Sequence, residues 1–290
     1  MNIQLECIPC TLNSYLRLVK TGVIPETQQE AILRRLLKGL AVIDFDKSPP
    51  VLGRRMHRLI RELLQNPDPY HQIKEKYNHM MLELYSKFEG MIDGSEDPFD
   101  TAMRLAIAGN VIDFGPQGQL DVMDTINRVK GARLAIDDSR HLHHDLKKAT
   151  SLLYIGDNCG EIVLDKLFLN YMNVPRKIFA VRARPIINDV TYYDAKMTGM
   201  EKVAKVITTG DDAPGAVWES TSKEFKEIFR NADVIISKGQ GNLEGLLDVP
   251  HDNIYFLLVT KCDLIAERLG TEKEQFVVKK GTVNESYHSL

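Results

Sequence analysis

The chain has 290 residues, of which 43% are hydrophobic and 27% are charged, and its formal net charge is −3 at pH 7. This composition is ordinary for a globular protein that is long enough for two domains. The small negative charge argues against nucleic acid as the main partner, because proteins that bind phosphate backbones usually carry a basic excess. The sequence contains neither an apolar run of about 18 residues nor a secretory signal, so we expect a cytoplasmic protein without a membrane partner.

The first half of the chain has helical periodicity, with apolar residues recurring at spacings of three and four. Prolines separate the periodic segments. The predicted helices cover residues 10–20, 25–40, 51–64, 70–91 and 99–108. A loop at 108–115 follows, which we expect to fold against the second half. We therefore predict a mainly helical, all-α N-terminal domain over residues 1–149.

From about residue 150 the period of the sequence changes. Short β-branched runs alternate with helical stretches, and these runs lie at 152–155, 177–181, 205–208, 233–237 and 254–259. Strand–helix repetition of this kind predicts a parallel sheet with helices on both faces. A further run beginning at Phe276 could add an edge strand. We therefore predict an α/β domain over residues 150–290.

Polar clusters directly follow four of the predicted strands. Asp157 and Asn158 follow the first strand, and Asp189 lies in the loop after the second. Because ligands of parallel α/β sheets bind beyond the carboxyl ends of the strands, we expect these loops to converge on one site. Carboxylate and amide oxygens suit Mg²⁺ or Mn²⁺, and three such ligands leave room for water and substrate oxygens.

The loop after the fourth strand has features of an anion-binding site. Lys238 supplies a point charge, and Gly239 and Gly241 allow backbone N–H groups to approach an anion. The helix that begins near Asn242 adds its positive end. The order and spacing of these residues differ from those of a Walker A sequence.

Other charged residues near these loops have candidate roles in the same chemistry. Arg182 and Arg184 could clamp a phosphate group, and Glu161 or Asp263 could move protons. Asp157 could alternatively act as a covalent nucleophile, as in enzymes that form an aspartyl phosphate.

Cys7 and Cys10 form a Cys-Ile-Pro-Cys sequence for which three interpretations stay open. The pair could be redox-active, could contribute to a metal site, or could be two half-buried thiols at the start of a helix. The histidines at 141, 143 and 144 favour a solvated helix face over a metal site, because no cysteine or further histidine lies near them in the sequence.

Three blocks of the sequence resemble the damage-control phosphatases, a family long catalogued as domain of unknown function 89. In order, they are Gly-Asp-Asn-Cys-Gly-Glu at 156–161, Arg-Pro-Ile-Ile-Asn-Asp-Val-Thr at 184–191, and Ser-Lys-Gly-Gln-Gly-Asn-Leu-Glu at 237–244. The N-terminal cysteine pair and Gly-Asn-Val-Ile-Asp at 109–113 are similar to the stand-alone microbial branch. The resemblance covers nearly the whole chain.

This resemblance implies a helical N-terminal domain, a Rossmann-like second domain and a divalent metal ion (Mn, Mg, Ni or Co) held by Asp157, Asn158 and Asp189. Lys238 matches the family position that meets the substrate phosphate. Members hydrolyse phosphate monoesters, often sugar phosphates or phosphorylated cofactor precursors that are damaged or surplus. Cys159 departs from the small residue that relatives commonly carry, which leaves the ligand assignments intact.

We therefore expect a metal-dependent phosphatase that acts on small phosphorylated metabolites. The predicted catalytic residues are Asp157, Asp189 and Lys238. The predicted substrate-binding residues are Asn110, Glu161, Arg184, Lys238, Gly239, Gly241 and Asn242. The alternatives are a non-catalytic protein that binds metal or phosphometabolites or senses redox state, and a carboxyl methyltransferase, an activity described for some relatives. A homo-oligomer is compatible with the sequence.

Overall fold

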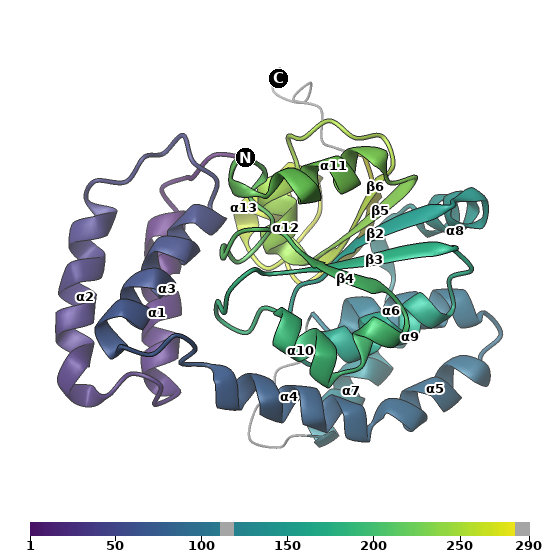
Figure 1. Cartoon of the computed structure of the whole chain (residues 1–290), viewed down its shortest axis with the longest axis horizontal. Coiled ribbons are helices and arrows are strands. Elements are labelled where there is room, and N and C mark those ends of the chain that lie inside the picture. Colours follow the sequence, from purple (N-terminus) through teal and green to yellow (C-terminus); the bar gives the residue numbers. More distant parts are fainter. Residues whose placement is uncertain (111–118, 282–290) are drawn as a thin grey trace.

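The computed structural model describes residues 1–110 and 119–281 (Figure 1). Its α-helices are α1 (Cys7–Lys20), α2 (Glu26–Leu40), α3 (Pro50–Leu64), α4 (His71–Glu83), α5 (Tyr85–Asp93), α6 (Pro98–Ala108), α7 (Gln119–Lys130), α8 (Ser139–Lys148), α9 (Glu161–Asn170), α10 (Tyr192–Met197), α11 (Lys223–Asn231), α12 (Gly239–Leu246) and α13 (Asp263–Leu269). Every helix in the described ranges is too short or too polar to span a bilayer.

The strands form one seven-stranded sheet in the order β1-β7-β6-β5-β2-β3-β4. Their bounds are β1 (Leu134–Asp137), β2 (Ser151–Ile155), β3 (Arg176–Val181), β4 (Lys205–Thr208), β5 (Val234–Lys238), β6 (Ile254–Val259) and β7 (Phe276–Lys280). All neighbouring pairs are parallel except β6 and β7. The predicted α/β fold is therefore confirmed, and β2, β5 and β6 are buried throughout, as strands covered on both faces must be.

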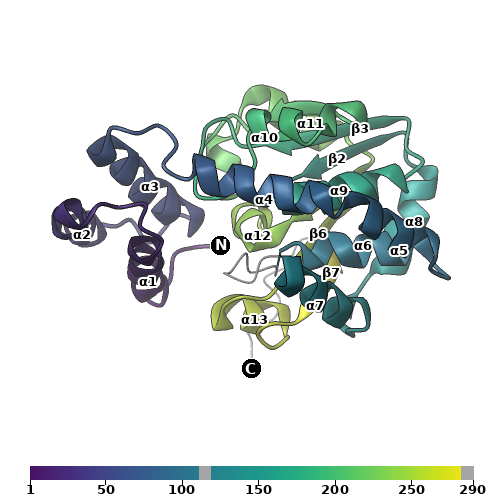
Figure 2. The same cartoon turned by 90° about the horizontal axis from the view of Figure 1, so that it is seen from below.

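Helices cover both faces of the sheet and bury two separate apolar clusters against it. Helices α4 to α10 contribute to the larger cluster, and α11 to α13 to the smaller. Helices α1 to α3 pack mainly on one another, around a third core that includes Tyr15, Ile32 and Ile60. Both views show these three helices as a group beside the sheet (Figures 1 and 2). We call this group the three-helix unit.

Charged side chains join the three-helix unit to the sheet. Arg54 forms an ion pair with Asp211, and Arg58 and Arg61 both form ion pairs with Asp212. The two aspartates follow β4, at the carboxyl edge of the sheet. We call these five residues the α3 latch.

Three features predicted from the sequence need correction. Strand β1 lies inside the segment 1–149 that was predicted to be all-α, and it pairs with β7. The strand β7 that was predicted at an edge lies between β1 and β6, so β1 forms the edge instead. The segment 70–91 is two helices that meet at Leu84. Strand β1 reads Leu-Ala-Ile-Asp and contains one β-branched residue, whereas the equally short β4, which was predicted, reads Lys-Val-Ile-Thr and contains three. Whether residues 1–149 and 150–290 are separate domains stays a prediction.

Candidate active site

The candidate site lies where the strand order reverses. From β2 the chain continues to β3 on one side, whereas β5 lies on the other side of β2. In open α/β sheets this arrangement leaves a crevice beyond the carboxyl ends of the strands. Asp157 follows β2 and Lys238 ends β5, so residues 81 positions apart in the sequence meet at the carboxyl ends of neighbouring strands.

The loop after β2 pairs with the loop after β3. The Val190 amide donates to the Asp157 carbonyl at 2.9 Å, and the Cys159 amide donates to the Asn188 carbonyl at 2.7 Å. Asn158 and Asp189 form an isolated antiparallel bridge. The structure therefore brings the loops of the three predicted metal ligands together.

The carboxylate of Asp157 is held by two side-chain amides. Its Oδ2 accepts hydrogen bonds from Asn110 Nδ2 at 2.7 Å and from Asn158 Nδ2 at 2.8 Å. A Cβ at Gly239 would lie 1.9 Å from this oxygen, and Gly239 has a φ of +76°. Only glycine meets both conditions, because it has no Cβ and adopts positive φ without strain. Asn110 therefore belongs to the site, while the rest of its predicted loop, 111–115, lies outside the described residues.

Glu161 and Lys238 form a buried ion pair next to Asp157. Glu161 Oε2 accepts hydrogen bonds from the amides of Asn110 at 3.2 Å and Asn158 at 3.0 Å. Its Oε1 lies 2.5 Å from Lys238 Nζ, and both side chains have no exposed surface. Glu161 is thus linked to the groups that hold Asp157.

The ammonium group of Lys238 has a complete set of protein acceptors. Besides Glu161, it donates to Asp165 Oδ1 and to the Ala106 carbonyl, both at 2.8 Å. Tyr154 donates its hydroxyl to the same Asp165 oxygen at 2.6 Å. An ammonium group has three N–H donors, so the predicted contact with a substrate phosphate would require an exchange of partners.

Sequence reasoning missed Asp165 and Tyr154. The signal for Asp165 was its place one helical turn after Glu161 within an otherwise apolar stretch of α9. A carboxylate at such a position is seldom buried without a partner. Nothing in the spacing of the residues identified Tyr154, which is one of several apolar residues in β2.

Arg182 is a fully buried arginine between the two aspartates. Its Nε donates to Asp189 Oδ2 at 2.7 Å, its Nη2 donates to Asn242 Oδ1 at 3.0 Å, and Nη2 lies 3.8 Å from Asp157 Oδ1. Arg182 thus holds the Asp189 carboxylate in place and contacts both acidic side chains. The guanidinium thus donates to two side-chain acceptors of the protein, Asp189 and Asn242.

Two predicted substrate-binding residues support the backbone instead. Asn242 is fully buried; it accepts from the Ala216 amide at 2.8 Å and donates to the Gly156 carbonyl at 3.1 Å. A Cβ at Gly241 would lie 2.3 Å from the Pro214 carbonyl oxygen. These positions allow α12 to pack against a neighbouring loop, and their predicted contact with an anion stays a prediction.

Two other candidates lie at the surface. Arg184 is exposed, on the same loop as Asp189. Asp263 is 85% exposed and pairs with Lys273, so the structure places it outside the buried charge cluster. Between Arg184 and Asp189, Ile187 has a φ of +43°. Positive φ is strained for a β-branched residue, and such strain is concentrated at functional loops.

Burial perturbs both candidate metal-binding carboxylates. Burial and the neighbouring Glu161 raise the pKa of Asp157, although Lys261, Arg182 and Lys238 oppose the rise. Burial raises the pKa of Asp189 to about 7 against the opposing charge of Arg182, and Asp157 contributes to the rise. Two adjacent carboxylates that resist ionisation are a feature of functional sites.

The side chains present fit a hard divalent cation. Asp157, Asn158 and Asp189 offer only oxygen ligands, which suit Mg²⁺ or Mn²⁺. The buried Oδ1 of Asn110, beside Asp157, has no hydrogen-bond partner. Among residues 1–110 and 119–281, no group of three or more His, Cys, Asp and Glu side chains could hold a metal. The predicted set differs from such a group, because it has two carboxylates and one amide.

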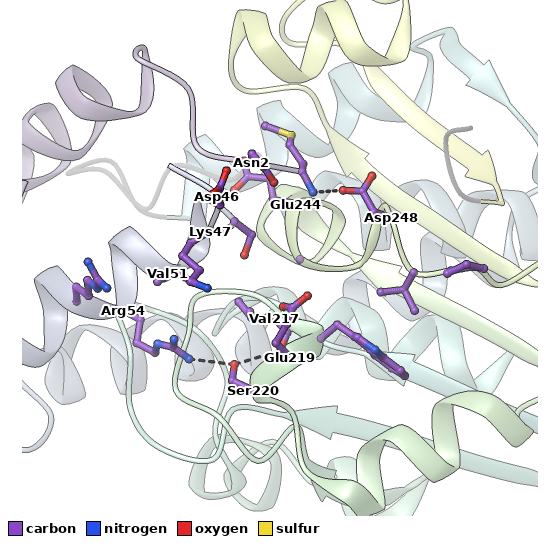
Figure 3. Close-up of a pocket in the computed structure, with 17 residues that line it drawn as sticks. Asn2, Asp46, Lys47, Val51, Arg54, Val217, Glu219, Ser220, Glu244 and Asp248 are labelled. Carbon is purple, nitrogen blue, oxygen red and sulfur yellow. Dashed lines mark hydrogen bonds and ion pairs between the residues drawn. The ribbon is translucent and has the colours of Figure 1, made fainter. Parts of the chain in front are cut away.

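A cavity of about 550 Å³ lies between the three-helix unit and the sheet (Figure 3). Lys47 and Arg54 line it on one side, and Ser220, Glu244 and Asp248 on the other. None of the predicted site residues lines this cavity. Helix α12 connects the two places, since its first residue touches Asp157 and its later residues form part of the cavity wall.

The four cysteines are free thiols, and of these only Cys159 lies between the proposed ligands, where its Sγ donates to the Asp189 carbonyl at 3.8 Å. Cys7 is half-buried at the start of α1, Cys10 is exposed, and both are free thiols. Cys159 is also a free thiol, and burial raises its pKa well above the usual value, which keeps it protonated and unreactive. His143 stacks on Phe99 with ring centroids 4.0 Å apart.

Residues 3–277 match the family model of the damage-control phosphatase ARMT1-like domain. A damage-control phosphatase of Pyrococcus horikoshii is 34% identical over 289 residues, covering 96% of this chain and 97% of the relative. An uncharacterized protein of Methanocaldococcus jannaschii is 32% identical over 97% of this chain and 96% of its own length. A damage-control phosphatase of Archaeoglobus fulgidus is 32% identical over 79% of this chain and 81% of its own.

The fold agrees with these sequence matches. The crystal structure of a P. horikoshii protein of the same domain family superposes with a TM-score of 0.89 at 32% identity, covering 97% of this chain and all of that one. The family predicted from the three sequence blocks is therefore confirmed. The chain belongs to the damage-control phosphatase family.

Proposed function

We propose that this chain is a divalent-metal-dependent phosphatase that hydrolyses monoesters of small phosphorylated metabolites. Family membership supports a phosphatase. The observation that supports the metal dependence is the backbone pairing of the two loops that carry Asp157, Asn158 and Asp189. These oxygen donors lie where α/β proteins bind ligands.

A bound divalent ion would polarise the phosphoryl group and neutralise the charge that develops on its oxygens. The protein would orient the ligands before substrate arrives. Asn110 and Asn158 hold one oxygen of Asp157, and Arg182 holds one oxygen of Asp189. Fixed ligands and burial from water increase electrostatic stabilisation of a transition state.

In this proposal Lys238 supports the site through Glu161. Its ammonium group pairs with one oxygen of the fully buried Glu161, and the other oxygen of Glu161 accepts from both amides that hold Asp157. The outer partners of metal ligands typically contribute about 10–100-fold to metal affinity or activity. Lys238 would therefore influence catalysis indirectly, through its contact with Glu161.

The test is a phosphate-release assay with a panel of sugar phosphates and phosphorylated cofactor precursors. Each substrate is assayed with Mg²⁺, Mn²⁺, Co²⁺ or Ni²⁺ and with a chelator. We expect release with at least one ion, and a loss of more than about 100-fold in Asp157→Asn, because a direct ligand should matter more than an outer partner. Asp233→Asn is the control, since Asp233 binds Thr150 and Ser151 at the opposite edge of the sheet.

Two results would contradict the proposal. One is full activity in the chelator, and the other is equal activity in Asp157→Asn and the wild type. Binding of metal without phosphate release on any substrate would favour a non-catalytic role. The cytoplasmic location and the possible homo-oligomer stay predictions.

A further inference from the structure

Asn78 is a fully buried polar residue on α4, in the part of the chain that carries no predicted site residue other than Asn110. Its Oδ1 accepts a hydrogen bond from the Gly160 amide at 2.7 Å. Its Nδ2 donates to Asp194 Oδ1 at 3.1 Å. One side chain thus connects two segments that are 34 residues apart.

The first contact fixes the end of the Asp157 loop. Gly160 immediately precedes α9 and has a φ of +78°. The first amides of a helix have no acceptor within the helix, and a buried one needs a partner from elsewhere. Asn78 provides that partner for the amide of Gly160, which lies three residues after Asp157.

The second contact fixes the end of the Asp189 loop. Asp194 Oδ2 accepts from the Thr191 amide at 2.9 Å and from its hydroxyl at 2.6 Å, which caps α10. Asp194 is therefore tied to a residue two positions after Asp189. Because Asn78 binds the other oxygen of Asp194, α4 holds this loop as well.

The surroundings of Asn78 favour one orientation of its amide. Lys74, one turn earlier on α4, has its Nζ 3.6 Å from Asp194 Oδ2 and 2.8 Å from Asp68. Asp194 is therefore held by a cation and an amide from the same helix. Exchanging the amide oxygen and nitrogen of Asn78 would place two N–H groups against each other at Gly160, which is unfavourable in a buried site.

We propose that Asn78 is a positioning residue for the metal centre, and this inference rests on the proposed function. It holds the loop that carries Asp157 and Asn158 at a fixed distance from the loop that carries Asp189. The backbone bridge between Asn158 and Asp189 joins the loops near the ligands, and Asn78 joins them again where the following helices begin. The N-terminal helices thereby contribute to the geometry of a site whose ligands all lie after residue 150.

The test exchanges the hydrogen-bonding partners. Asn78→Asp keeps an acceptor for Gly160 but places a second carboxylate against Asp194. We expect this variant to weaken Mn²⁺ binding by about 10–100-fold, the range for outer partners of metal ligands. The double variant Asn78→Asp/Asp194→Asn restores a donor and an acceptor with unchanged net charge, and we expect it to recover most of the lost affinity.

Two measurements separate positioning from simple destabilisation. Mn²⁺ affinity is measured by electron paramagnetic resonance well below the unfolding temperature, and amide hydrogen exchange is followed in the metal-free protein. We expect faster exchange in segments 156–160 and 188–194 of Asn78→Asp, with recovery in the double variant. Ser151→Ala is the control, because it removes a part-buried hydrogen bond to Asp233 at the opposite end of the strands.

Unchanged Mn²⁺ affinity and unchanged exchange in both segments of Asn78→Asp would overturn the inference, even if its thermal midpoint fell like that of Ser151→Ala. A double variant no better than the single one would also overturn it. If the wild type bound no Mn²⁺, the metal-dependent function would fail, whereas exchange in the metal-free protein would still decide whether Asn78 joins the two loops.

Discussion

The α3 latch and the candidate active site both pair arginine with buried aspartates but differ in charge balance. In the latch, burial acts to raise the pKa of Asp212, yet hydrogen bonds from Arg58 and Arg61 lower it to about 2. At the site, burial raises the pKa of Asp189 to about 7, although Arg182 opposes the change and Asp157 adds to it. The latch therefore stabilises the ionised form of Asp212, whereas the site disfavours the ionised form of Asp189.

The depth of burial and the number of cations together explain the difference. Three arginines face two aspartates in the latch. Among the described residues, the buried contacts of the site join four carboxylates to two cations; these residues are Asp157, Glu161, Asp165, Asp189, Arg182 and Lys238. A desolvated cluster with excess negative charge is favourable for binding a cation. The latch has no such excess and serves to join two parts of the molecule.

The largest expected effect comes from removing one cation from each cluster. Lys238→Met leaves Glu161 and Asp165 buried without their partner, which should lower the free energy of unfolding by about 3–5 kcal/mol. Arg58→Gln should cost less than about 1 kcal/mol, because Arg58 is half-exposed and Arg61 still pairs with Asp212. Urea unfolding of both variants measures the two values. Equal losses would contradict the distinction between the clusters.

Metal binding should give the second-largest difference between the two clusters. Mn²⁺ at 100 times its dissociation constant should stabilise the wild type by about 2.7 kcal/mol. The gain should disappear in Asp157→Asn and persist in Asp212→Asn, since only the first change removes a proposed ligand. Thermal unfolding with Mn²⁺ and with a chelator measures this difference. A gain that survived Asp157→Asn would place the ion elsewhere.

The pH dependence of stability should have opposite signs in the two clusters. Burial and Glu161 raise the pKa of Asp165 to about 7 against the opposing charge of Lys238. The contribution of Asp165 to the free energy of unfolding is therefore complete below pH 3.8 and is lost as the pH rises through 7. Asp212 contributes above pH 3.8, and that contribution is lost as the pH falls through about 2. A single group contributes at most about 1.4 kcal/mol per pH unit.

Urea unfolding of the metal-free protein between pH 2 and pH 8 tests these signs. Asp165→Asn should flatten the fall in stability on the alkaline side, and Asp212→Asn should flatten the fall on the acidic side. If Asp165→Asn instead steepened the alkaline fall, the direction of its pKa shift would be wrong. A variant at the exposed Asp263 should leave both slopes unchanged.

Sequence patterns predicted the strands of the sheet better than the roles of individual side chains. Buried strands are long apolar runs, and the polar residues that follow them must lie at one edge, so the proximity of Asp157, Asn158 and Asp189 followed from topology alone. The role of Gly241 did not follow in the same way. Its missing Cβ accommodates a loop near Pro214, which only the folded chain brings there.

The sequence by itself determined the family, the α/β class and the loops that carry the proposed ligands, because these depend on local periodicity and on short blocks of residues. Only the tertiary structure showed that Lys238 is enclosed by protein acceptors and that Asn78 reaches both loops. The physical reason is that hydrogen bonds between distant segments leave no periodic trace in the sequence. Such contacts are decided by how helices pack on the sheet, which depends on the whole core.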